Sequence, residues 1–126
     1  MSGVILVVDD DTENREVMVE LLKDSGFAAH AVSSAVEALT FLQEEERRVR
    51  FLITDFQMPV ISGLELIRHA LKERPDLPII LITGEASDDV CKSGLEAGAM
   101  KVFIKSAPWE KVEAAIREAL NERQCA

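Results

Sequence analysis

Cysteine is scarce in this sequence, and long hydrophobic runs are absent. The two cysteines, Cys91 and Cys125, lie far apart and form no CxxC pair, so neither a disulfide framework nor a zinc site is indicated. No apolar run approaches the roughly 20 residues that a membrane-spanning helix needs, and Met1–Gly3 leads directly into a strand-like segment rather than a signal peptide. We therefore expect a cytoplasmic protein that makes no contact with membranes.

Basic residues are also few relative to acidic ones. Lys and Arg total 14 against 23 Asp and Glu, which gives a formal net charge of −9. That charge would repel the phosphates of nucleic acids and of anionic lipids, so direct binding to nucleic acid is not expected. With 48% apolar residues and no internal repeat, linker or composition break, residues 1–126 are predicted to form one folded domain.

Short apolar runs rich in Val, Ile and Leu recur along the chain without alternating polar residues. This pattern is typical of strands that are buried on both faces of a sheet. The clearest runs are Val4–Val8, Phe51–Ile53 and Ile79–Ile82, and two weaker ones, Ala28–Val32 and Lys101–Ile104, complete the predicted strands.

Between these runs lie longer stretches with apolar residues at helical spacing. Ser34 and Ser62 are each followed three residues later by Glu, as in a capping box, and Gly26, Pro75 and Gly98 mark helix ends. The predicted apolar stripes are Val17, Met18, Leu21 and Leu22; Ala38, Leu39 and Leu42; Leu64, Ile67 and Leu71; and Val112, Ile116 and Leu120. Five strands alternating with five helices predict an α/β fold with a doubly wound parallel sheet.

Polar residues follow four of the predicted strands at the point where each strand ends. They are Asp9, Asp10 and Asp11 after the first, Asp55 after the third, Thr83 after the fourth and Lys105 after the fifth. The carboxyl ends of parallel strands meet at one edge of the sheet, where ligands bind in doubly wound folds. We therefore expect one site, with Asp11 serving as the N-cap of the following helix rather than as part of it.

The residue types in this predicted site indicate phosphoryl chemistry. The carboxylates of Asp9, Asp10 and Asp55 would repel one another unless a cation lay among them, and their oxygen ligands suit Mg²⁺. A carboxylate can attack a phosphoryl group if the charge on the transferring oxygens is neutralised, a task that fits Lys105 and the metal. Thr83 offers a hydroxyl donor to a phosphoryl oxygen, and Gly84 beside it leaves room for the group.

These motifs resemble the receiver domains of bacterial response regulators over nearly the whole chain. Val4–Asp11 resembles the first strand and acidic pocket of that family, and Asp55–Pro59 with Gly63 resembles its phosphoacceptor signature. Pro78–Gly84 and Phe103–Lys105 resemble the two remaining motifs.

The resemblance implies a flavodoxin-like fold with strand order 2-1-3-4-5 and a specific role for each site residue. Asp55 would accept the phosphate and also ligate Mg²⁺, Asp10 would bind the ion directly, Asp9 would act through water, and Gln57 would contribute its backbone carbonyl. The implied phosphodonor is a sensor histidine kinase or a histidine phosphotransfer protein, although small phosphodonors can also serve. The implied output is a downstream protein target that binds a surface formed by the fourth helix, fifth strand and fifth helix.

The sequence departs from the family pattern at two positions. Ser106 stands where a proline usually follows the lysine through a cis peptide, and a cis bond before serine would cost roughly 3 kcal/mol, which favours trans. Val102 stands where an aromatic switch residue is usual, and the adjacent Phe103 should point to the opposite face of its strand. We expect Thr83, Gly84, Val102 and Phe103 to carry the readout of phosphorylation, and the absence of an aromatic residue at Val102 to change how that readout works.

We favour a signalling switch that catalyses only its own phosphorylation and slow dephosphorylation, so it is not an enzyme with an external product. One alternative is a pseudo-receiver, an interaction module that is not phosphorylated, but such a module would be expected to lack an acceptor, acidic or lysine residue that is present here. Another is a magnesium-dependent phosphatase of the haloacid dehalogenase-like type, which would need an acid/base residue where Gln57 stands. The sequence contains neither a GxGxxG nor a GxxxxGK[ST] loop.

Overall fold

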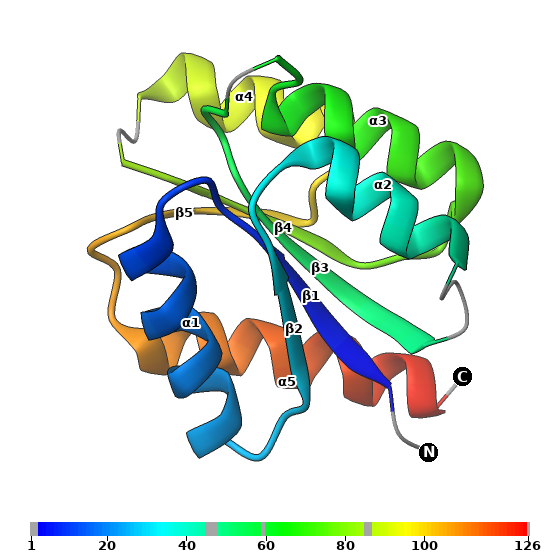
Figure 1. Ribbon diagram of the computed structural model, residues 1–126. Coiled ribbons are helices and arrows are strands. Elements are labelled where there is room, and N and C mark those ends of the chain that lie inside the picture. Colours follow the sequence, from blue (N-terminus) through cyan, green and yellow to red (C-terminus); the bar gives the residue numbers. More distant parts are fainter. Residues whose placement is uncertain (1–2, 45–47, 59, 85–86, 126) are drawn as a thin grey trace.

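Five short parallel strands form the centre of the computed structural model, which describes residues 3–44, 48–58, 60–84 and 87–125 (Figure 1). The strands are β1 (Val4–Val8), β2 (Ala29–Val32), β3 (Val49–Asp55), β4 (Ile79–Thr83) and β5 (Lys101–Ile104). They pair in the order β2-β1-β3-β4-β5, all parallel. The predicted α/β class and the implied strand order are both confirmed.

Helices cover both faces of this sheet. They are α1 (Thr12–Asp24), α2 (Ala35–Glu44), α3 (Gly63–Glu73), α4 (Asp88–Ala97) and α5 (Trp109–Cys125). Figure 1 shows α1 and α5 on one face and α2, α3 and α4 on the other. No helix in the described ranges combines the length and the apolar content needed to span a bilayer.

The side chains of β1 explain why its sequence is apolar at every position. Leu6 and Val8 pack in the core beneath α2, α3 and α4, whereas Ile5 and Val7 pack in the core beneath α1 and α5. Successive residues of a strand point to opposite faces, so a strand covered on both sides needs apolar residues throughout. Burying a full side chain of this kind stabilises the fold by about 1.5–3 kcal/mol.

Two strands extend further than the sequence predicted, and β2 begins one residue later than expected. β3 continues through Thr54 to Asp55 because these residues pair with Leu81 and Ile82 of β4. Likewise, β4 includes Thr83, which pairs with Ile104. Thr54, Asp55 and Thr83 therefore belong to the sheet itself, which fixes their backbone positions.

Val17 is a wrong assignment in the predicted apolar stripe of α1. Its side chain is 55% exposed, whereas Leu22 is fully buried. Val17 precedes Leu22 by five residues, which turns it about 140° away around a helix of 3.6 residues per turn. The stripe that covers the sheet consists of Met18 and Leu22, with Leu21 half-buried beside them.

The predicted helix boundaries are confirmed, with one difference in detail. Gly26 and Gly98 end helices with positive φ angles of 93° and 122°, and Ser62 caps α3 by accepting from the Glu65 N–H. Ser34 likewise accepts from the Glu37 N–H at 3.1 Å, but the Glu37 carboxylate binds the hydroxyl of Ser33 at 2.9 Å rather than the Ser34 N–H. The reciprocal half of this capping box is thus shifted by one residue.

Candidate functional site

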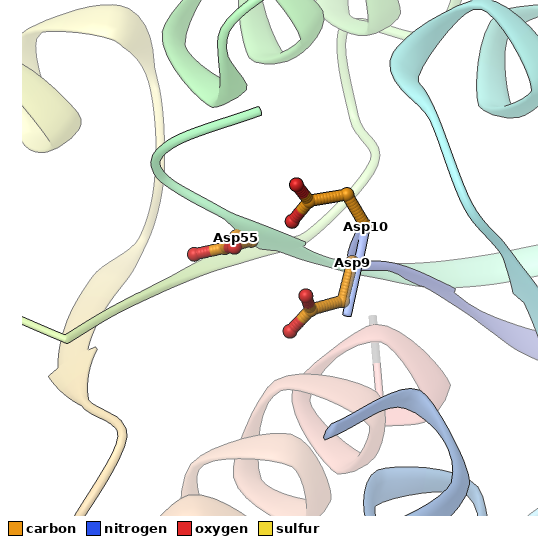
Figure 2. Close-up of side chains that lie close together, drawn as sticks. All are labelled: Asp9, Asp10 and Asp55. Carbon is orange, nitrogen blue, oxygen red and sulfur yellow. The ribbon is translucent and has the colours of Figure 1, made fainter. Parts of the chain in front are cut away.

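Three carboxylates converge at the carboxyl ends of β1 and β3. Asp9 and Asp10 directly follow β1, and Asp55 is the last residue of β3. Figure 2 shows the three side chains pointing to the same side of the sheet edge, where a ligand oxygen of each lies within 4.8 Å of the others. Because Val8 pairs with Thr54, the residues that follow them must emerge side by side. The cluster predicted from the strand ends is therefore present.

Asp9 is held in place through both oxygens of its side chain. Oδ1 accepts a hydrogen bond from the Asp11 N–H at 2.9 Å, and Oδ2 lies 3.6 Å from Nζ of Lys105. The Asp11 carboxylate in turn accepts from the Asn14 N–H at 3.1 Å, which confirms its role as the N-cap of α1. Asp9 is buried, whereas Asp10 is exposed, so Asp10 has more freedom to bind a ligand.

Lys105 brings a positive charge to the same cluster from the end of β5. Its Nζ lies 3.4 Å from Oδ2 of Asp55 as well as 3.6 Å from Oδ2 of Asp9. Partial burial alone would lower the pKa of this ammonium, but the charges of Asp55 and Asp9 outweigh burial and raise its pKa above 10.5. Lys105 is therefore a permanent cation at the site at neutral pH.

The Asp55 carboxyl lies in an environment that disfavours its charged form. Burial, followed by the negative charge of Asp9, raises its pKa above the ordinary value of 3.8, and the ammonium of Lys105 offsets this only in part. Burial disfavours the carboxylate because it removes water from the charge, and the Asp9 carboxylate adds repulsion between like charges. A cation among the three carboxylates would favour the ionised form of Asp55 against both effects.

A cavity of about 280 Å³ opens beside Asp55. Asp55, Gln57, Thr83, Gly84 and Lys105 are among its lining residues. The structure thus brings the predicted hydroxyl donor, the predicted cation and the predicted acceptor to one space. A Cβ added at Gly84 would meet no atom within 4 Å among the described residues beyond its two chain neighbours, so the room expected beside Thr83 is present.

Gly63 holds the loop after Asp55 close to the acceptor. Its N–H donates to the Phe56 carbonyl at 2.9 Å. A Cβ at this position would collide with the carbonyl oxygen of Asp55. The glycine that belongs to the motif therefore allows the first turn of α3 to pack directly on the backbone of the acceptor residue.

The two departures from the family pattern also have structural counterparts. Val102 packs on the face covered by α4, whereas Phe103 packs on the opposite face, as predicted. A Cβ added at Gly94 of α4 would lie 2.8 Å from side-chain atoms of both Val102 and Leu81, so α4 approaches this valine closely. Every peptide bond among the described residues is trans, including Lys105–Ser106.

Arg15 is a residue at this site that the sequence analysis did not identify. Its Nη1 donates to the Asp9 carbonyl at 2.8 Å, and its Nη2 donates to Oγ1 of Thr12 at 3.2 Å. The available signal was its place in the first helix, four residues after the Asp11 cap. That spacing alone does not show that the side chain turns back toward the acidic loop.

Comparison with known proteins identifies the same family over most of the chain. The model of the response regulator receiver domain matches residues 5–117. The response regulator MprA of Mycobacterium tuberculosis is 35% identical over 121 residues, which cover 96% of this chain and 52% of MprA. The C4-dicarboxylate transport transcriptional regulatory protein DctD of Rhizobium meliloti is 31% identical over 120 residues, covering 95% of this chain and 26% of DctD.

Solved structures give the same result for the fold. A response regulator receiver domain protein from Clostridium thermocellum superposes with a TM-score of 0.91 at 28% identity, covering 98% of both chains. A CheY-like receiver domain protein from Methanospirillum hungatei gives a TM-score of 0.90 at 29% identity, again covering 98% of both chains.

The present chain spans about a quarter of the length of DctD and about half of the length of MprA.

Proposed function

Because the chain belongs to the response regulator receiver domain family, we propose that it is a phosphorylation switch whose acceptor is Asp55. The observation that carries this proposal is the convergence of Asp9, Asp10 and Asp55 at one sheet edge, with Lys105 Nζ 3.4 Å from the acceptor oxygen. We further propose a sensor histidine kinase or a histidine phosphotransfer protein as the donor, a downstream protein as the target, and the cytoplasm as the location.

The carboxylate cluster fits Mg²⁺, which prefers oxygen ligands and tolerates few protein groups in its coordination shell. Asp55 and Asp10 would bind the ion directly, with the backbone carbonyl of Gln57 as a further ligand. Asp9 would act through water, which is consistent with the use of its Oδ1 by the Asp11 N–H. When bound, the ion would neutralise charge on the phosphoryl oxygens.

In the proposed reaction, a carboxylate oxygen of Asp55 attacks the phosphorus of a phosphohistidine. A phosphorus–oxygen bond forms while the phosphorus–nitrogen bond breaks, and its electron pair returns to the imidazole nitrogen. The ammonium of Lys105 favours the ionised form of Asp55 before the reaction and binds a phosphoryl oxygen afterwards. Thr83, which lines the same cavity, would donate its hydroxyl to another phosphoryl oxygen.

The test is the mass of the intact protein after incubation with acetyl phosphate. One added phosphoryl group is expected with Mg²⁺, and none with excess EDTA. A protein that binds a partner but never gains this mass would support the pseudo-receiver alternative instead. Steady release of phosphate from small esters would support the phosphatase alternative.

Asp10→Ala is expected to weaken Mg²⁺ binding more than Asp9→Ala does. A direct ligand loses a metal–oxygen bond, whereas a water-mediated contact can be replaced in part by solvent. We expect about a 10-fold loss for Asp9→Ala and a larger loss for Asp10→Ala, measured by titrating the apo protein while following amide resonances. Equal affinities in the wild type and both variants would place the ion elsewhere.

The structural response of α4 to phosphorylation of Asp55 is expected to depend on Thr83 more than on Val102. Val102 is β-branched, packs against Gly94 of α4, and lacks the ring that would fill the space left by a moving Thr83. We therefore propose that coupling runs through the loop after Thr83 to α4, at about 1–3 kcal/mol. Thr83→Ala should erase the phosphorylation-dependent shifts of the α4 amide resonances, and Val102→Ala should spare most of them. A larger loss from Val102→Ala would show that this position carries the switch.

A further inference from the structure

Arg15 makes contacts with the acidic loop that the proposed phosphorylation chemistry does not use. It lies in the first half of α1, is half-buried, and reaches back across the start of the helix. Nη1 donates to the Asp9 carbonyl at 2.8 Å and Nη2 to the Thr12 hydroxyl at 3.2 Å. A planar guanidinium that spans two acceptors holds both in a fixed relation.

The carbonyl that Arg15 binds belongs to the peptide bond between Asp9 and Asp10. The orientation of this peptide plane sets the direction in which the Asp10 side chain leaves the backbone. Asp9 is fixed independently, because its N–H donates to the Val32 carbonyl at 3.3 Å and its carboxylate binds the Asp11 N–H and Lys105. Asp10, by contrast, is exposed, and its side chain has no hydrogen-bonding partner within the described part of the chain.

We propose that Arg15 is a positioning residue for the metal pocket. By holding the Asp9–Asp10 peptide in one orientation, it keeps the Asp10 carboxylate facing Asp9 and Asp55 before an ion arrives. Side chains that orient metal ligands typically change affinity by 10- to 100-fold when they are removed. This inference rests on the proposed function in one respect, the binding of Mg²⁺ among the three aspartates.

The experiment is a Mg²⁺ titration of apo variants followed by amide resonances, with no phosphodonor present. Arg15→Ala is expected to raise the dissociation constant about 10-fold, at the lower end of the range for such orienting partners. Arg15→Lys keeps the charge but loses the fork, so its affinity should lie between those of the alanine variant and the wild type. Thr12→Val removes only the second acceptor and leaves the contact with the Asp9 carbonyl, so it should weaken Mg²⁺ binding less than Arg15→Ala does.

Arg74→Ala is the matched control. Arg74 also donates to a backbone carbonyl at 2.8 Å, that of Val49, and this contact is likewise part-buried. Val49 begins β3, whereas Asp55 ends it, so the control lies at the opposite end of the same strand. Its Mg²⁺ affinity should equal that of the wild type.

Three results would overturn the inference while leaving the proposed function intact. They are an unchanged affinity in Arg15→Ala, an equal loss in Arg74→Ala, and full recovery of affinity in Arg15→Lys, which would show that the planar guanidinium bridging two acceptors is not required. If the wild type itself bound no Mg²⁺, both this inference and the metal site of the proposed function would fall. Thermal unfolding in EDTA identifies any variant that has lost its fold. If Arg15→Ala does not fold, the Mg²⁺ affinity of Arg15→Lys relative to the wild type becomes the test.

Discussion

Asp55→Asn is expected to abolish phosphorylation completely. The amide is nearly the same size as the carboxyl but lacks the anionic oxygen that attacks phosphorus. Asp55 ends β3 with only 7% of its surface exposed, and it lines the cavity that also reaches Thr83 and Lys105. Mass measurement after incubation with acetyl phosphate and Mg²⁺ should show one phosphoryl group on the wild type and none on the variant.

The matched control for this substitution is Asp76→Asn. Asp76 is an exposed aspartate that precedes β4, at the edge of the sheet opposite the acidic cluster. This variant should gain one phosphoryl group at the wild-type rate. If instead Asp55→Asn were fully phosphorylated at another acid-labile position, Asp55 would not be the acceptor.

The melting temperature of the Asp55→Asn variant at different pH values would test independently whether this variant is folded. Burial and the charge of Asp9 raise the pKa of Asp55 above 3.8. Between pH 3.8 and this raised pKa, the folded state therefore binds more protons than the unfolded state. The ionised carboxyl therefore destabilises the folded apo protein at neutral pH, and this penalty fades as pH falls toward 3.8. In EDTA, the variant should melt above the wild type at pH 7 and show a smaller difference at pH 4. A lower melting temperature at pH 7 would mean that attraction to Lys105 outweighs burial.

Much of the fold follows from the sequence because buried parallel strands have an unusual requirement. Val4–Val8 is apolar at each position, and the structure buries alternate residues beneath different helices. Once the strands are parallel, their carboxyl ends share an edge, so Asp9, Asp10, Asp55, Thr83 and Lys105 must gather there. These residues therefore come together because of the sheet topology, and that topology can be predicted from the pattern of apolar residues in the sequence.

The sequence does not report the contacts that depend on how far a long side chain reaches. Arg15 looks like an ordinary surface residue of α1, and only its rotamer in the folded chain brings its guanidinium to the Asp9 carbonyl. The collision that excludes a side chain at Gly63 likewise depends on how α3 packs against the backbone of Asp55. Val17 was wrongly predicted to face the sheet, although it is exposed. An apolar residue beside the buried stripe of a helix does not by itself show which face of the helix packs on the sheet.

Lys105→Ala is expected to slow phosphorylation about 100-fold, the lower end of the loss seen when one group that stabilises a developing oxyanion is removed. Its Nζ is the cation of this chain that lies within 4 Å of both Asp55 and Asp9 in the described residues. Without it, Asp55 is harder to ionise, and one phosphoryl oxygen loses its partner in the product. The rate of mass gain with acetyl phosphate at saturating Mg²⁺ measures the loss.

The same variant should also separate phosphorylation from structural change. Lys105 directly follows β5, and its N–H donates to the Thr83 carbonyl at 2.8 Å, so its backbone is tied to the end of β4 whatever its side chain. Removing the ammonium should therefore leave the fold in place but deprive the phosphate of a contact that distinguishes the two states. Lys105→Arg, which keeps the charge, should recover part of the rate, and Lys101→Ala, at the exposed start of the same strand, should behave as the wild type. If the phosphorylated Lys105→Ala protein formed at the wild-type rate and shifted its amide resonances as the wild type does, Lys105 would have neither role.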